Sequence, residues 1–174
     1  IRAGDRVTLI ISDSSRDEPR AAMLNQLRAR LPAVRLTVAV ATGTHGHCAV
    51  DDLGLPAWAL PHVYMHDGHT LDGLVALGTT ARGTPVRVAR CVVDTDWVIA
   101  TGCVRPHYFA GFGGGNKAIF PGLGFAPDIR ANHRLKAEPG ARAGELAHNP
   151  CRLDIDEAVE RVPVPKRLLA GLVG

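Results

Sequence analysis

The residue types best suited to chemistry are gathered in one segment, residues 105–133. The segment holds a run of glycines, one lysine and two histidines: Gly113, Gly114, Gly115, Lys117, His107 and His133. Glycine lets the main chain approach a ligand closely, because it has no Cβ. A lysine can form a covalent bond through its neutral amine, and histidine transfers protons or binds metal near neutral pH. Most of the 20 Lys and Arg residues are arginines, so a lysine here indicates that the amine itself matters.

Two earlier loops carry further candidates. Asp13 and Arg16 follow the apolar run Arg6–Ser12, and His45 closes a Thr-Gly-Thr-His loop after a second apolar run. The guanidinium of Arg16 could bind a carboxylate or a phosphate. His45 and His107, on separate loops, could act as acid and base on opposite faces of one substrate.

Each of these residues also has an ordinary structural interpretation. Asp13 could cap a helix, and a single loop histidine is often structural. The glycine run fits neither the Walker A pattern nor G-x-G-x-x-G, but its N–H groups could still bind an anion. A non-catalytic nucleotide- or anion-binding module therefore stays open. So does a zinc-dependent hydrolase that uses His45, His47 and another histidine.

Composition limits the class of protein. The 174 residues are 46% hydrophobic and 21% charged, which is typical of a globular domain. A net charge of +3, without a basic run, argues against nucleic acid as a partner. No apolar run is long enough for a membrane span, and the N-terminus does not resemble a signal peptide. Four scattered cysteines are expected to be reduced thiols of a cytoplasmic protein.

Hydrophobic patterning predicts an α/β fold with a Rossmann-like, mostly parallel sheet, flanking helices and a small β-rich insertion. Strands are expected over residues 6–12, 34–41 and 96–101, and helices over 18–31, 51–60, 126–138 and 150–162. The short runs 62–66, 74–79 and 85–92, separated by Asp-Gly and Arg-Gly turns, predict the insertion. Three polar loops follow the core strands, and ligands of such sheets bind beyond the carboxyl ends of the strands. We therefore expect these loops to meet at one site.

Residues 1–160 are predicted to form a cofactor-binding and catalytic α/β domain. The chain starts without a methionine, and a first strand region is expected to be missing before Ile1. Residues 161–174, which contain two prolines, are predicted to be a linker or a truncated end.

Taken together, the motifs resemble the N-terminal domain of the nickel-dependent lactate racemase family. The matching pieces occur in order along nearly the whole chain: Ser12-Asp13-Ser14-Ser15-Arg16 with Pro19, Ala41-Thr42-Gly43-Thr44-His45, His66-Asp67, Leu77-Gly78-Thr79, Gly83-Thr84-Pro85-Val86, residues 105–133 and Asn149-Pro150. The chain departs from the family pattern at Gly46, where arginine is common, and at Gly113, where serine is common. The family's C-terminal domain would be absent from these residues.

The resemblance implies a cofactor and the residues that hold it. The cofactor is a nickel-pincer nucleotide, pyridinium-3,5-bisthiocarboxylic acid mononucleotide with bound nickel, which dedicated biosynthesis enzymes supply. Lys117 would tether it and His133 would be the protein ligand to nickel. Gly113, Gly114 and Gly115 would let it approach the main chain, and Asp13 would help to build the site.

The resemblance also implies the reaction, which is racemisation or epimerisation of lactate or a related 2-hydroxy acid by proton-coupled hydride transfer to the cofactor. His45 and His107 would be the paired acid and base, and Arg16 would hold the substrate carboxylate. Without the C-terminal domain, this part of the protein is expected to be inactive alone. The oligomeric state does not follow from the sequence.

Overall fold

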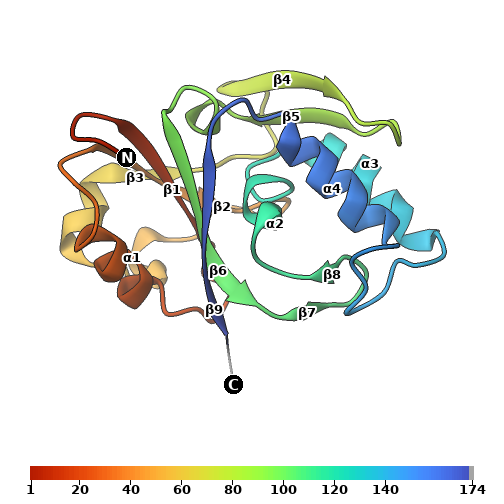
Figure 1. Cartoon of the computed structure of the whole chain (residues 1–174), viewed down its shortest axis with the longest axis horizontal. Helices are drawn as coiled ribbons and strands as arrows, with labels where there is room; N and C mark the ends of the chain where they lie inside the picture. The colour runs from red at the N-terminus through yellow and green to blue at the C-terminus, as the bar shows by residue number, and fades with distance from the viewer. Residues whose placement is uncertain (173–174) are drawn as a thin grey trace.

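The computed structural model describes residues 1–172, which form an α/β fold around one five-stranded sheet (Figure 1). The strand order is β3-β2-β1-β6-β9, and every neighbouring pair is parallel. These strands are β1 (Arg6–Ser12), β2 (Arg35–Ala41), β3 (Val63–Met65), β6 (Trp97–Val104) and β9 (Lys166–Leu172). The predicted fold class is confirmed.

The central position of β1 follows from its sequence. Val7, Leu9 and Ile11 belong to one apolar cluster and Ile10 to another. Successive side chains of a strand point to opposite faces, so β1 is buried on both. Fully burying such a side chain stabilises the fold by roughly 1.5–3 kcal/mol. This energy favours the place of β1 between β2 and β6, where both faces are covered.

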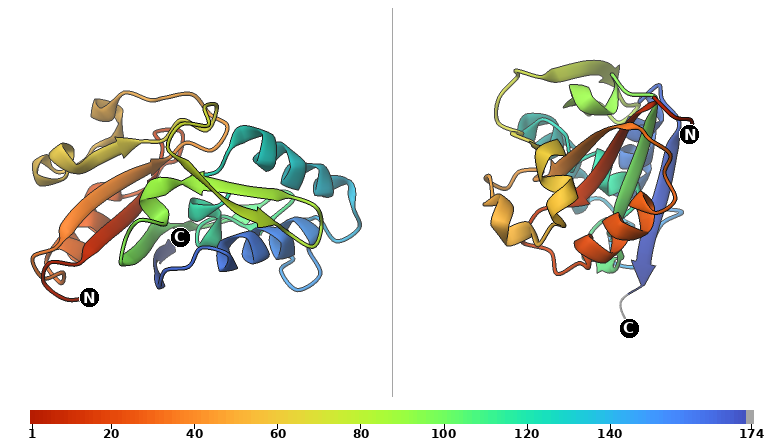
Figure 2. Two further views of the ribbon diagram at one scale, coloured as in Figure 1. Left: turned by 90° about the horizontal axis from the view of Figure 1, so that it is seen from above. Right: turned by 90° about the vertical axis from the view of Figure 1, so that its left-hand side faces the viewer.

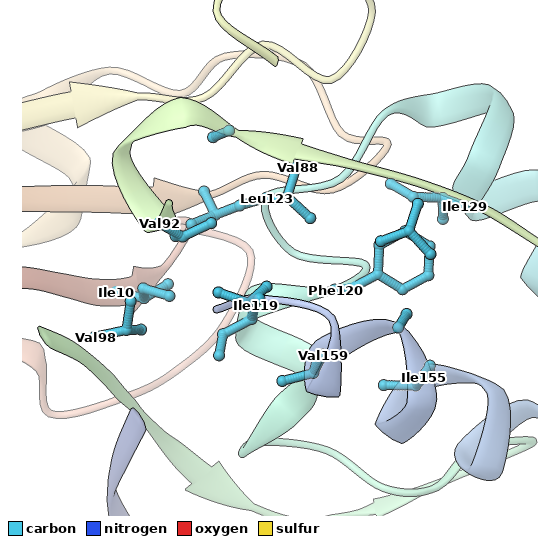
Figure 3. Close-up of a cluster of buried hydrophobic side chains, with 14 of the residues drawn as sticks. Ile10, Val88, Val92, Val98, Ile119, Phe120, Leu123, Ile129, Ile155 and Val159 are labelled. Carbon is cyan, nitrogen blue, oxygen red and sulfur yellow. The ribbon is translucent and has the colours of Figure 1, made fainter. Parts of the chain in front are cut away.

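Different helices cover the two faces (Figure 1). On one side lie α1 (Arg20–Arg28) and the 3₁₀ helices η1 (Val50–Leu53) and η2 (Ala57–His62). On the other lie α2 (Asn116–Ile119), α3 (Ala126–Arg134), η4 (Leu135–Ala137) and α4 (Pro150–Glu160). Ile119, Ile129 and Ile155 of these helices pack with Ile10 and Val98 of the sheet (Figure 3). Among residues 1–172, no helix is both long and apolar enough to cross a bilayer.

The predicted insertion is smaller than expected. β4 (Leu74–Thr79) and β5 (Pro85–Ala89) form an antiparallel hairpin that lies against α3 (Figure 2), and η3 (Arg90–Val92) follows. The segment 62–66, assigned to the insertion, instead contributes β3 to the main sheet, parallel to β2. β3 has only three residues, which is too short for a hydrophobic pattern that distinguishes a strand of the insertion from a strand of the main sheet. A second antiparallel pair, β7 (Pro106–His107) and β8 (Gly111–Phe112), lies within the glycine-rich segment.

Two other predictions need correction. The helix predicted over 51–60 is replaced by η1 and η2, in a region interrupted by Pro56 and Pro61. Residues 161–174 are predicted from the sequence to be a linker or a truncated end, but residues 166–172 form β9 and pair with β6, so they are not a linker. The prolines at 163 and 165 precede this strand and do not interrupt its ladder, so they are compatible with it. Residues 173 and 174 lie outside the described residues.

Buried carboxylates fasten α3 and α4 to the hairpin. The Asp154 carboxylate of α4 accepts hydrogen bonds from the hydroxyls of Thr80 and Thr84 and from Asn132 Nδ2. Asp128 of α3 forms an ion pair with Arg87 of β5. Because both carboxylates are only 1% exposed, their partners replace water and fix how α3 sits on the hairpin.

We predict that Asp154→Ala lowers the free energy of unfolding by about 3 kcal/mol or more, because three buried donors lose their acceptor. Urea unfolding measures this change. Asp94→Ala, which breaks only an exposed pair with Arg90, is the control and should leave the midpoint almost unchanged. Equal shifts for the two variants would contradict the anchoring role of Asp154.

Candidate active site

The three polar loops surround one cavity of about 500 Å³. Its walls come from the residues after β1, β2 and β6 and from the segment that leads to α3. The lining includes most of the residues singled out from the sequence: Asp13, Arg16, His45, His107, Gly113, Gly114, Lys117 and His133. The expected convergence of the loops is therefore found at the carboxyl ends of the parallel strands. Gly115 is not among the lining residues and instead precedes α2.

The loop after β1 joins the loop after β2 through a short polar contact. Asp13 Oδ2 lies 2.7 Å from His45 Nδ1, and Asp13 Oδ1 accepts hydrogen bonds from Ser15. Burial by itself would raise the pKa of Asp13, but the hydrogen bonds from Ser15 and His45 outweigh it and lower the pKa. Asp13 is therefore a carboxylate that orients the His45 ring, which is the role of the acidic partner in many acid–base pairs.

Arg16, on the same loop, lies at the cavity with an exposed side chain. Its guanidinium has no hydrogen-bond partner among residues 1–172, so its donors are available to a ligand. A planar guanidinium can bind both oxygens of a carboxylate at once.

His107 has a different environment from His45. Its Nδ1 accepts a hydrogen bond from the Ala110 N–H at 3.3 Å. Burial and the positive charges of Lys117, Arg16 and His133 lower the pKa of His107 to about 4. The imidazole is therefore neutral at physiological pH and free to exchange protons.

Lys117 and His133 both lie close to the Phe109 ring. Burial, followed by repulsion from Arg152 and Arg16, lowers the pKa of Lys117 to about 8. Burial is also the main reason that the pKa of His133 falls to about 4. His133 Nε2 is buried without a hydrogen-bond partner among residues 1–172, which is unusual for a ring nitrogen. A lysine amine that loses its proton readily and an unpaired imidazole nitrogen are both groups that can form a bond to a ligand.

Glycine is required at the main chain beside Lys117. Gly114 has φ +76°, and an added Cβ would lie 3.2 Å from the Cys103 carbonyl oxygen. Gly115 has φ +60°. Both residues adopt backbone conformations that disfavour other residues, and at Gly114 this leaves bare main chain at the wall of the cavity.

Sequence reasoning missed three residues of the site. Phe109 is 4% exposed, and its ring contacts His107 edge-on at 4.6 Å and His133 at 5.0 Å between centroids. Glu18 and Arg105 also line the cavity. Arg105 and Phe109 lie two residues before and after His107, and this closeness in sequence could have predicted that they line the site. Glu18 offers no such signal, because its contact with the Cys103 N–H joins residues that are 85 positions apart.

The zinc hypothesis receives no support from the side-chain arrangement. His45 lines the cavity but His47 does not. Within the part of the chain that the structure describes, no three His, Cys, Asp or Glu side chains are grouped to hold a metal. A single histidine ligand, such as His133, would need its other ligands from a bound cofactor.

The low pKa of Lys117 gives a test of the site's electrostatics. A lysine reacts with acylating reagents only as the neutral amine, so the rate for Lys117 should rise with pH and reach half its maximum near pH 8. Peptide mapping by mass spectrometry measures this on the cofactor-free protein, with exposed Lys136 as internal reference. A Lys117 profile identical to that of Lys136 would contradict the environment described here.

Comparison with known proteins shows what this architecture is similar to. Curated lactate racemases from Thermoanaerobacterium thermosaccharolyticum and Lactiplantibacillus plantarum are 28% and 29% identical to the chain, over 89% and 88% of its length. The chain spans only 39% of the length of each relative. The lactate racemase apoprotein structure from T. thermosaccharolyticum matches 99% of this chain and 44% of that one, with TM-score 0.86 and 25% identity.

A Thermotoga maritima protein shares the fold at TM-score 0.77 and 21% identity, covering 98% of this chain and 47% of its own. The family described as the lactate racemase N-terminal domain matches residues 1–144, which is most of the chain. The chain therefore belongs to the lactate racemase N-terminal domain family.

Proposed function

We propose that this chain forms the cofactor-binding and catalytic part of a racemase or epimerase that acts on lactate or a related 2-hydroxy acid. One observation carries the proposal: His45 and His107, from loops after different strands, line the same cavity as Arg16. Membership of the lactate racemase family supports the reaction class.

Arg16 would hold one end of the substrate still during the reaction. Its free guanidinium would bind the substrate carboxylate, so that only the central carbon changes configuration. An arginine is better suited than a lysine to this role, because its planar fork restricts the carboxylate to one orientation. The 2-hydroxyl group would then lie between the two histidines.

The two histidines differ in a way that suits complementary roles. The contact between Asp13 and His45 Nδ1 assigns the proton to Nδ1 and leaves a lone pair on His45 Nε2. The Ala110 N–H donates to His107 Nδ1, so neutral His107 carries its proton on Nε2. His45 would therefore accept the hydroxyl proton from one enantiomer, while His107 presents an N–H to the opposite face. For the other enantiomer, His107 would have to accept the hydroxyl proton, which requires its own Nε2 proton to move first to Nδ1 or to solvent.

The residues of the site fit the nickel-pincer nucleotide that the family resemblance implies. Lys117, with its lowered pKa, would attach the cofactor, and the unpaired Nε2 of His133 would be a ligand to nickel. Gly113 and Gly114 would give it access to the main chain. When bound, this cofactor supplies a hydride acceptor for the hydrogen on the substrate's central carbon. The enzymes that synthesise the cofactor would be the partners that load the site.

The buried Phe109 side of the cavity supports the proposed binding of the cofactor and the transfer of protons. Phe109 is packed against His107 and His133, and the Lys117 ammonium lies 5.7 Å from its ring centroid. The aromatic ring excludes water from three groups at once. Exclusion of water disfavours the charged form of each group, so both imidazoles are neutral and the Lys117 amine loses its proton more readily than an exposed lysine.

We predict that His45→Ala and His107→Ala each reduce racemisation by the full-length, cofactor-loaded protein by about 10²–10⁴-fold, because each removes one acid–base group. The interconversion of L- and D-lactate, followed by chiral chromatography in both directions, measures the effect. Nickel content should be unchanged in both variants.

His69→Ala is the matched control, because His69 is exposed and does not line the cavity. It should racemise at the parental rate. The two-histidine scheme is wrong if His45→Ala or His107→Ala also keeps that rate. Saturable nucleotide binding without any turnover would instead favour an anion-binding module.

A further inference from the structure

Arg20 occupies a position that its own helix disfavours. It is the first residue of α1, where the helix dipole presents partial positive charge and where a carboxylate is preferred. It is also only 7% exposed. The ion pairs found among residues 1–172 do not include it. The helix dipole disfavours a cation at this end, so the burial of Arg20 must be explained by its contacts outside the helix.

The partners of Arg20 are all main-chain carbonyls, at the end of β1 and in the loop between β1 and α1. Its Nε donates to the Ser12 oxygen at 2.9 Å, and its Nη2 donates to the oxygens of Asp13 and Arg16. A guanidinium has several donors in one rigid plane, so it can hold three carbonyls in a fixed arrangement. Lysine, with its single nitrogen on a flexible stem, cannot reproduce this geometry.

The loop that Arg20 holds carries two of the residues used in the proposed reaction. Arg16 lies at the cavity with a free guanidinium, while its own carbonyl is bound by Arg20. Asp13 contacts His45 through its side chain, and its carbonyl is also bound by Arg20. Arg20 itself does not line the cavity.

Glu18 fastens the same loop on its other side. Its carboxylate accepts a hydrogen bond from the Ser12 hydroxyl at 2.6 Å and from the Cys103 N–H at 3.0 Å. The loop is therefore tied to the end of β6, just before the segment that carries His107. With this side tied to β6, the guanidinium of Arg20 holds the carbonyls of Asp13 and Arg16 at the other end of the loop.

We propose that Arg20 is a positioning residue for substrate binding: it fixes the main chain of Arg16 and so places the guanidinium that binds the substrate carboxylate. The proposal rests on the proposed function of Arg16 as the carboxylate-binding residue. It concerns a residue that acts only through the loop and touches no substrate.

The test uses Arg20→Lys in the full-length, cofactor-loaded protein, with L-lactate as substrate. We expect KM to rise about tenfold while kcat changes less, because a misplaced Arg16 weakens binding of substrate and transition state alike. Hydrogen exchange of the Ser15 and Arg16 amides should become faster, since both amides donate to Asp13 within this loop. Arg28→Lys, an exposed arginine of the same helix, is the control and should change neither quantity.

A double-mutant cycle separates positioning from a merely structural role. If Arg20 acts through Arg16, then Arg20→Lys should leave KM nearly unchanged when Arg16 is already alanine. The same fold increase in KM in both backgrounds would overturn the proposal. So would parental KM and parental amide exchange in Arg20→Lys.

Arg20→Gln provides a second variant that buries no charge, for use if a buried lysine prevents folding. It is expected to show the same raised KM and faster exchange, and parental values would overturn the proposal equally. If the parental protein does not racemise lactate, the proposed function fails for that substrate. In that case, calorimetry measures the affinity for L-lactate of the parent, of Arg20→Gln and of both proteins with Arg16→Ala added. A positioning role predicts that Arg20→Gln weakens binding and speeds amide exchange, and that its effect on binding disappears once Arg16 is alanine.

Discussion

The whole site depends on the parallel pairing of β1 with β2 on one side and β6 on the other. Parallel neighbours end at the same edge of a sheet, so the loops that follow them are brought within reach of one ligand. Apolar side chains on both faces of β1 hold it in the middle, and a shift of one residue would turn its side chains to the wrong faces. The chemistry therefore rests on an arrangement that burial of hydrophobic surface enforces, although the loops themselves are polar.

Low solvent exposure is the second feature that shapes the site. Burial is the largest cause of the lowered pKa of His107, Lys117 and His133. Water exclusion favours the neutral form of each group, and nearby positive charges act in the same direction. Asp13 is the exception, because its hydrogen bonds keep it ionised beside His45. One cavity thus presents an oriented imidazole with a carboxylate partner beside two neutral imidazoles and a lysine that loses its proton readily.

The sequence alone predicted the parts of this structure that depend on local patterns. The strand at 6–12 was identified from its apolar, β-branched composition, and the grouping of three loops followed from the rule for parallel sheets. The edge strand β9 was not predicted, because prolines and a glycine surround its apolar residues. The contacts of Asp154 with Thr80 and of Glu18 with Cys103 join residues 74 and 85 positions apart. No local pattern contains such pairs, and the unpaired nitrogen of His133 is visible only once its surroundings are known.

The most direct test of the account is intact-protein mass and nickel analysis of the full-length protein, produced together with the enzymes that synthesise the pincer cofactor. The account predicts a nickel-containing adduct on the parental protein and none on Lys117→Ala. It also predicts that His133→Ala keeps the organic adduct but carries less nickel, because one ligand to the metal has been removed. An adduct that persists in Lys117→Ala, or a parental protein that carries neither adduct nor nickel after this treatment, would contradict the central claim that this cavity holds the cofactor.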